Sequence, residues 1–159
     1  MRVTHEMFAI LAAVVIAGGG HWLADGKPSG IPAIEMEQTP LAEGEIALET
    51  LQNEGREGVL FVDARRESEW RSDGLPGSIH LTTLSDQPLA DQLIPHFEEL
   101  LQARRIVVYC GDIHCGLSHE LAEALKTYPD LLGGEVSVLH GGVVALKQAG
   151  WIKETNPGS

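Results

Sequence analysis

The chain is short of basic side chains and of cysteine. Its 159 residues include 11 Lys and Arg against 23 Asp and Glu, which gives a formal net charge of −12 at pH 7. This acidic excess argues against nucleic acid or an anionic membrane surface as a partner, because both carry negative charge. Two cysteines are too few for a scaffold held together by disulfides. The length suits one domain with an extension, and it is sufficient for a sizeable core.

One long apolar run is present near the N-terminus. Residues 7–17 read MFAILAAVVIA, and the run reaches residue 24 if three glycines and a histidine are tolerated. It is just long enough for a bilayer, which takes about 20 residues. A signal anchor, a signal peptide cleaved after residues 15–17 and a buried helix are the alternatives. The glycines weaken a soluble helix by about 1 kcal/mol each, so we expect residues 1–24 to be a hydrophobic signal-anchor helix or a signal peptide.

The rest of the chain is predicted to be one α/β domain. Residues 25–43, in which proline and glycine are frequent, are an expected linker, and 155–159 are an expected frayed tail. Residues 44–154 alternate short β-branched runs with amphipathic stretches, which predicts a parallel β-sheet with helices on both faces. We expect strands at 59–62, 79–81, 106–109 and 136–139, and helices at 46–52, 67–71, 87–102 with Pro95 interrupting it, 121–125 and 143–149.

Both cysteines fall in one loop between a predicted strand and a predicted helix. The strand IVVY ends at Cys110, and Cys115 follows before the helix. A thiol in front of a helix meets free N–H groups and the positive end of the helix dipole. Such a position lowers the pKa of a thiol and favours the nucleophilic thiolate. Cys110 is therefore the candidate nucleophile, and the alternative is a buried cysteine that packs as a small hydrophobe.

Four motifs, in this order, resemble the rhodanese-like domain family. They lie between residues 46 and 151 and read VLFVDARRESEW, GLPGSIHL, IVVYC with its loop and helix, and VLHGGVVALKQAGW. Four motifs in order are more specific than any one alone. The resemblance implies a single-domain sulfurtransferase with a parallel sheet and no cofactor. In it, Cys110 accepts a sulfane sulfur, a sulfur atom bonded to another sulfur, and holds it as a persulfide.

The predicted active-site loop is a variant of the family's common C-x-x-G-x-R-S pattern. Cys115 stands where the family has arginine, and the loop carries no Lys or Arg at all. Without a cation, a dianion such as thiosulfate loses a charge-assisted contact, which argues against it as the donor. Gly116 stands where a related C-x5-R phosphatase needs its arginine, which argues against that activity. The loop residues are Gly111, Asp112, Ile113, His114, Gly116 and Ser118.

Cys115 is open to three interpretations. It could be a resolving thiol that attacks a persulfide or sulfenate on Cys110, a disulfide partner of Cys110, or an ordinary loop residue; the Cα separation decides whether a disulfide fits. Cys110, His114, Cys115 and His119 also match C-x3-H-C-x3-H. Structural zinc sites usually join two separated ligand pairs, so we expect no metal. His114 could instead donate to the thiolate or face solvent.

Other polar residues are expected to support the fold. Asp63 and Arg65 should form a buried or half-buried pair that braces the loop. His80 and His140, near strand ends, are expected to be packing or turn residues. The acidic residues between 35 and 57 are expected to form a solvated face.

Three functions fit these residues. The first is a sulfurtransferase that moves sulfur through a Cys110 persulfide to a thiol or another nucleophile. The second is a thiol–disulfide redox switch that uses Cys110 and Cys115, and the third is an inactive rhodanese-like module that binds a partner. The expected partners are a small-molecule or protein sulfur donor, a thiol acceptor and the membrane, through residues 7–24. Arg2 before that run predicts a domain on the periplasmic side, or a secreted domain if the leader is cleaved.

Overall fold

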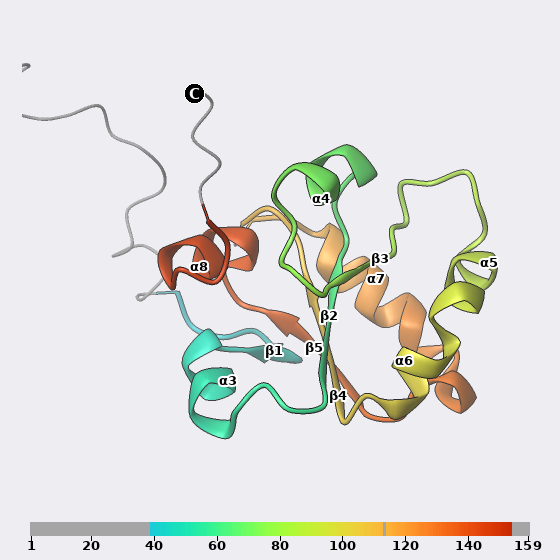
Figure 1. Cartoon of the computed structure of the whole chain (residues 1–159), viewed down its shortest axis with the longest axis horizontal. Helices are drawn as coiled ribbons and strands as arrows, with labels where there is room; N and C mark the ends of the chain where they lie inside the picture. The colour runs from blue at the N-terminus through green and yellow to red at the C-terminus, as the bar shows by residue number, and fades with distance from the viewer. Residues whose placement is uncertain (1–38, 113, 154–159) are drawn as a thin grey trace, which may run out of the picture. The chain divides into compact units, whose positions relative to one another are not determined.

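A parallel sheet forms the centre of the domain (Figure 1). The computed structural model describes residues 39–112 and 114–153, and in these residues five strands form one sheet. The strand order is β1-β5-β4-β2-β3, and each neighbouring pair is parallel. β4 is therefore the middle strand. The strands are β1 (Glu45–Ile46), β2 (Val59–Asp63), β3 (Ile79–His80), β4 (Arg105–Tyr109) and β5 (Glu135–Leu139).

Helices cover both faces of the sheet. The residues buried beneath α3 and α8 form one hydrophobic cluster, and those beneath α5, α6 and α7 form another. This arrangement confirms the predicted α/β fold with helices on both faces. The helices are α3 (Leu48–Glu54), α4 (Glu67–Asp73), α5 (Leu89–Leu93), α6 (Phe97–Gln102), α7 (Leu117–Lys126) and α8 (Gly142–Gln148), with short 3-10 helices η1 (Ile94–His96) and η2 (Pro129–Leu131).

The middle strand contributes to both clusters by strict alternation. Ile106 and Val108 pack under α5, α6 and α7, whereas Val107 and Tyr109 pack under α3 and α8, and all four are fully buried. Alternation with period two is what a strand imposes. Each buried aliphatic side chain contributes about 1.5–3 kcal/mol, so the register of β4 is firmly set. Cys110 follows directly and belongs to the cluster of Ile106 and Val108.

One predicted element differs from the structure. The helix expected at 46–52 begins at Leu48, and Glu45–Ile46 instead forms strand β1, whose residues pair with Val138 and Leu139 of β5. Two residues are too few to show a periodicity, so pairing with β5 decides their conformation. The helix expected at 87–102 is interrupted around Pro95 as predicted, because proline lacks the N–H that a continuous helix needs.

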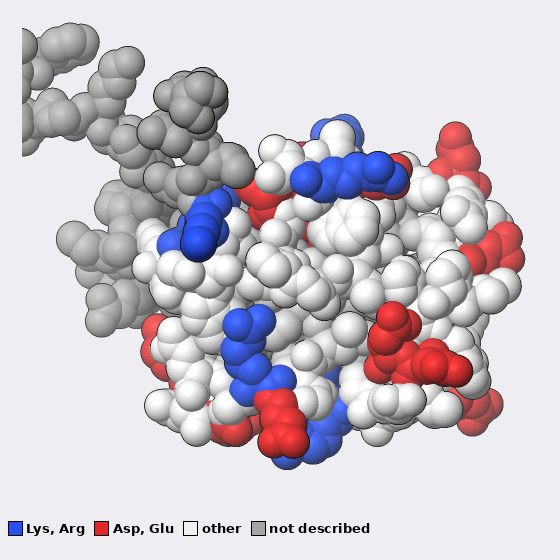
Figure 2. All heavy atoms as spheres, in the orientation of Figure 1, with Lys and Arg blue, Asp and Glu red and all other residues white. Residues whose placement is uncertain are grey.

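Charge is unevenly spread over the face shown in Figure 2. Acidic side chains without a basic neighbour lie over α5 and α6, whereas basic and acidic ones lie together over α4 and near α3. The expected leader 1–24, the linker up to residue 38 and the tail 155–159 fall outside the described residues. Among the helices of the described part, none combines the length and the apolarity that crossing a membrane requires.

Candidate active site

Cys110 lies at the carboxyl end of the middle strand and directly precedes the loop to α7. Its side chain is 1% exposed. The start of α8 holds its backbone, because the carbonyl oxygen of Cys110 accepts a hydrogen bond from the Val143 N–H at 2.8 Å and Gly142 packs against it. A Cβ at Gly142, whose φ is +52°, would lie 2.5 Å from that oxygen. The turn between β5 and α8 therefore fixes the position of Cys110.

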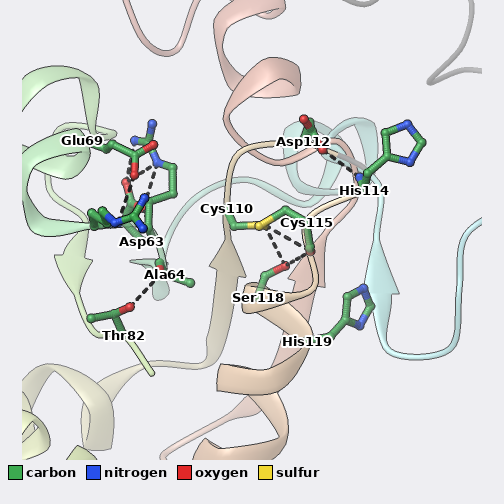
Figure 3. Close-up of a disulfide and its surroundings, with 12 residues drawn as sticks. Asp63, Ala64, Glu69, Thr82, Cys110, Asp112, His114, Cys115, Ser118 and His119 are labelled. Atoms are coloured by element: carbon green, nitrogen blue, oxygen red, sulfur yellow. Dashed lines mark hydrogen bonds and ion pairs between the residues drawn. A yellow bond between two sulfur atoms is a disulfide. The ribbon is translucent and has the colours of Figure 1, made fainter. Parts of the chain in front are cut away.

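The loop folds back on itself and joins the two cysteines in a disulfide (Figure 3). Asp112 makes the turn: its carbonyl oxygen accepts from the Cys115 N–H at 3.3 Å, and its Oδ1 accepts from the His114 N–H at 2.8 Å. The Cα atoms of Cys110 and Cys115 are 6.3 Å apart, within the range that a disulfide spans. Of the interpretations open for Cys115, the structure has the disulfide partner.

Ser118, in the first turn of α7, is the polar side chain nearest the buried sulfur. Its Oγ lies 3.3 Å from Cys110 Sγ and 3.5 Å from the Cys115 carbonyl oxygen, and the residue is 3% exposed. That carbonyl oxygen is itself 3.3 Å from Cys110 Sγ. A disulfide sulfur carries no proton, so the hydroxyl is the donor of this group. In a reduced site, the same hydroxyl could donate to a Cys110 thiolate.

Other loop residues lie away from the sulfurs. The rings of His114 and His119 point away from the disulfide in Figure 3. Two loop amides, those of His114 and Cys115, bond to Asp112 and so are not directed at Cys110 Sγ. An Asp side chain competes with other acceptors for nearby amides, so the His114 amide is not one of the free N–H groups that the sequence predicts around Cys110. Gly111 and Gly116 complete the turn, and Ile113 falls outside the described residues.

An ion-pair network centred on the buried Asp63 and Arg65 lies at the end of the neighbouring strand β2. Arg65 donates to both carboxylate oxygens of Asp63, with a shortest distance of 2.7 Å, and to Asp73 at 2.9 Å. Lys147 of α8 also pairs with Asp73, at 2.5 Å. Burial alone would lower the pKa of Arg65, but the bonds to Asp63 and Asp73 raise it above its usual range. The network thus joins β2, α4 and α8.

Tyr109, the residue before Cys110, connects the end of β2 to the site. The Ala64 N–H donates to the Tyr109 carbonyl oxygen at 2.9 Å. The Tyr109 hydroxyl accepts from the Leu75 N–H at 3.0 Å and lies 3.2 Å from Ser78 Oγ. Burial raises the pKa of Tyr109 above its usual range, so this hydroxyl stays neutral and anchors the end of β4. His80 has a comparable supporting place, since its Nε2 lies 2.8 Å from the Arg65 carbonyl oxygen.

A second cluster beside the loop joins a glutamate to two histidines. Glu45 of β1 lies 3.1 Å from His119 Nε2 and 2.9 Å from His140 Nδ1 through its two oxygens. Partial burial alone would raise the pKa of Glu45, but the Ala42 N–H and the two histidines hold it below its usual value. Glu45 is thus an exception to the solvated acidic face expected for residues 35–57. Within the described residues, no three His, Cys, Asp or Glu side chains form a metal-binding group.

Sequence reasoning missed the Glu45 cluster and the partners of Arg65. His119 and His140 are 74 and 95 residues from Glu45, and Lys147 lies on the last helix while Asp73 ends α4. Only the strand order brings these side chains together. Glu45 lies in a two-residue strand, so no local signal in the sequence could have marked it.

Comparisons with known proteins agree with this architecture. The model of the rhodanese-like domain matches residues 47–149. The BH2092 protein of Bacillus halodurans has a similar structure, with a TM-score of 0.50 and 21% identity over 70% of this chain and 77% of its own. Thiosulfate sulfurtransferase from Pseudomonas aeruginosa (TM-score 0.48, 27% identity) matches 70% of this chain, which spans only 20% of that protein. RPA3614 of Rhodopseudomonas palustris, a protein of unknown function described as a possible tyrosine phosphatase, has a TM-score of 0.44 and 26% identity over 79% of this chain and 97% of its own. No curated protein matches the sequence.

Proposed function

The chain belongs to the rhodanese-like domain family, and on that premise we propose that its reduced form is a sulfurtransferase whose nucleophile is Cys110. The single observation that carries the proposal is the place of Cys110. It directly follows the middle strand of the sheet, inside the matched domain, and its Sγ lies 3.3 Å from the Oγ of Ser118 in the first turn of α7. A thiol in that position meets the positive end of the helix dipole, which favours the thiolate.

The proposed reaction has two half-reactions. The Cys110 thiolate attacks the outer sulfur of a donor persulfide, the donor's S–S bond breaks, and a thiolate leaves while Cys110 becomes a persulfide. An acceptor thiolate then attacks the terminal sulfur of that persulfide and expels the Cys110 thiolate. Sulfur moves from donor to acceptor with no net change in oxidation state, and the covalent intermediate predicts ping-pong kinetics.

The charges around the site favour a persulfide over thiosulfate as the donor. Residues 110–120 contain no Lys or Arg, so no loop cation is available to hold a sulfonate group. Asp112 adds a negative charge to the same loop. Ser118 supplies a neutral donor 3.3 Å from Cys110 Sγ, which suits a singly charged sulfur. We therefore propose a small-molecule or protein persulfide as donor and a thiol as acceptor.

The test is sulfur uptake by the reduced protein. The full chain is reduced, freed of reductant and exposed to glutathione persulfide, and its mass is measured with and without alkylation. We expect donor sulfur to pass through Cys110, seen either as a protein-bound sulfur that an acceptor thiol removes or as sulfide released from the protein. Cys110→Ser should show neither. Equal sulfur uptake and release by Cys110→Ser and by the unsubstituted chain would refute the assignment.

The disulfide favours a second candidate, a thiol–disulfide redox switch. Cys110 Sγ is bonded to Cys115 Sγ in the structure, so Cys110 has no thiolate with which to attack a donor. In this reading the two cysteines cycle between thiols and disulfide, and no sulfur is transferred. The same mass measurement distinguishes the two candidates. Loss of two hydrogens without any protein-bound or released sulfur would support the switch and contradict the transferase.

We also propose that residues 7–24 anchor the domain on the periplasmic side of a membrane. The apolar run supports this proposal, and so does the disulfide, because disulfides persist mainly in oxidising compartments. Fractionation of cells that express the full chain, with protease added to intact spheroplasts, provides the test. We expect a membrane-bound, protease-accessible domain. Recovery in the periplasmic soluble fraction would indicate a cleaved leader, and protection from protease would refute the placement.

A further inference from the structure

The disulfide joins two cysteines of unequal exposure. Cys110 is 1% exposed, whereas Cys115 is partly exposed. In this oxidised form Cys110 has no thiolate that could attack a sulfur donor. The bond must therefore be made and broken in a defined order if Cys110 carries sulfur. The order of these steps is inferred from the disulfide that joins Cys110 Sγ and Cys115 Sγ.

We propose that Cys115 resolves the persulfide on Cys110 and releases hydrosulfide, so that the domain reduces sulfane sulfur as well as carrying it. The inference rests on the proposed function, since it starts from the Cys110 persulfide. The Cys115 thiolate attacks Cys110 Sγ, the inner sulfur. A Cys110–Cys115 disulfide forms, the bond to the terminal sulfur breaks, and that sulfur leaves as hydrosulfide. Two thiols are oxidised, and one sulfane sulfur is reduced to sulfide by the same two electrons.

The loop geometry favours attack on the inner sulfur. The bond present in the structure joins Cys115 Sγ to Cys110 Sγ, and that bond is the product of this attack. Asp112 holds the turn that brings Cys115 to Cys110 through two hydrogen bonds to the loop backbone. A thiol held at this separation acts intramolecularly, which gives it a large advantage over a thiol that arrives from solution.

Among the described residues, the groups around Cys110 offer a persulfide anion little stabilisation beyond the dipole of α7. Ser118 is the donor within reach, whereas the Cys115 carbonyl oxygen, 3.3 Å from Cys110 Sγ, presents negative partial charge. No Lys or Arg occurs in residues 110–120, and the amides of His114 and Cys115 are engaged by Asp112. A weakly stabilised persulfide is a good starting point for resolution. Release of hydrosulfide removes the negative sulfur from this site.

A dithiol reductant completes the cycle. Its thiolate attacks Cys115 Sγ, the accessible half of the bond, and Cys110 leaves as the thiolate that the next donor needs. The second thiol of the reductant then resolves the mixed disulfide on Cys115, and the reductant ends as a disulfide. Burial of Cys110 thus directs the reductant to Cys115. The overall reaction consumes one donor persulfide and one dithiol and yields a thiol, hydrosulfide and an oxidised dithiol.

The test is a single turnover of the full chain with sulfide and protein mass measured together. Reduced, desalted protein receives one equivalent of glutathione persulfide, and released sulfide is captured with bromobimane. We expect the unsubstituted chain to release sulfide and to end as the disulfide. Cys115→Ser should instead keep a persulfide on Cys110 and release roughly tenfold less sulfide or lower still. Cys115→Ala serves as a second variant in case Cys115→Ser folds poorly.

The outcomes separate this inference from the proposed function. If Cys115→Ser and the unsubstituted chain both keep the persulfide, or both release sulfide equally, resolution by Cys115 is refuted and the sulfurtransferase stands. If neither the unsubstituted chain nor either Cys115 variant takes up or releases sulfur, both proposals fail. Sulfide release that is coupled to disulfide formation and abolished in the Cys115 variants supports the inference.

Discussion

Two polar regions at the carboxyl edge of the sheet use charge in opposite ways. At the end of β2, Arg65 and Lys147 neutralise Asp63 and Asp73 in one network, in which Arg65 and Asp63 are buried and the other two are partly exposed. Around the disulfide, residues 110–120 have no Lys or Arg, and Asp112 and Glu45 bond to backbone amides and histidines instead. Arg65 and Lys147 thus contribute to the stability of the fold. The sulfur site relies on backbone position, one hydroxyl and the second cysteine.

The difference predicts which substitutions affect stability and which affect chemistry. A residue of the β2 network should change the free energy of unfolding strongly, because its partners are buried. A residue near Cys110 should change sulfur reactivity with a smaller effect on unfolding. The following substitutions test this division.

Arg65→Met should have the largest effect. It leaves Asp63, which is fully buried, without its partner, and an uncompensated buried charge costs about 3–5 kcal/mol. Urea denaturation measures the loss. Arg71→Met is the matched control, because it removes an Arg–Glu pair whose side chains are 70% and 59% exposed. The control should have nearly the same free energy of unfolding as the unsubstituted chain. Equal losses of stability in both variants would contradict the greater importance of the Arg65 network.

Gly142→Ala should come next, because it links the two regions through the backbone of Cys110. A left-handed φ costs a non-glycine residue about 1–2 kcal/mol, and the new Cβ would meet the Cys110 carbonyl oxygen at 2.5 Å. We expect a total loss of about 2–3 kcal/mol and slower sulfur uptake. Gly150→Ala is the control, with φ +73° and open space around its Cβ. This control should lose only the stability that the left-handed φ costs, about 1–2 kcal/mol, and its sulfur uptake should be unchanged.

Much of the β2 region and of the sheet was predictable from the sequence. The short apolar runs that begin at Val59 and Ile106 predict buried strands. Asp63 and Arg65 follow the first of these runs in a recognisable motif. Pro95 marked the break between α5 and α6 because a missing N–H acts locally. Local chemistry was sufficient in these places.

The remainder depends on long-range pairing. The sequence pattern places Ile46 in the helix expected at 46–52, and only the pairing of Ile46 with Leu139 decides for the strand. The Glu45 cluster follows from that pairing. The sequence left the disulfide between Cys110 and Cys115 open, because the loop geometry depends on how Asp112 bonds to the backbone. Two amides that bond to one residue, the His114 N–H to the Asp112 side chain and the Cys115 N–H to its carbonyl oxygen, leave no periodic signal in the sequence.

Ser118→Ala should alter reactivity more than stability. The variant is made in a Cys115→Ser background, so that Cys110 is the single thiol. Loss of the hydroxyl 3.3 Å from the sulfur removes a donor to the thiolate, and a hydrogen bond to a charged group contributes about 1.5–3 kcal/mol. We expect alkylation of Cys110 by iodoacetamide at pH 7 to slow roughly tenfold or more. Ser137→Ala, in the same background, removes another buried serine and should leave the rate unchanged; a similar decrease in both variants would contradict the assigned role.

Glu45→Gln should have the smallest effect and a distinctive pH dependence. The pKa of Glu45 in the folded chain lies below the ordinary 4.5, so the carboxylate stabilises the fold at pH values above 4.5 and loses this contribution as the pH falls below it. At pH 7 we expect the variant to be less stable by about 1 kcal/mol, because two histidine contacts and the Ala42 amide contact weaken. The difference from the unsubstituted chain, measured by urea denaturation, should shrink as the pH falls below 4.5. Glu43→Gln, an exposed change in the same segment, should stay close to the unsubstituted chain. A difference for Glu45→Gln that persists undiminished well below pH 4.5 would show that the region around the loop is not held by this carboxylate.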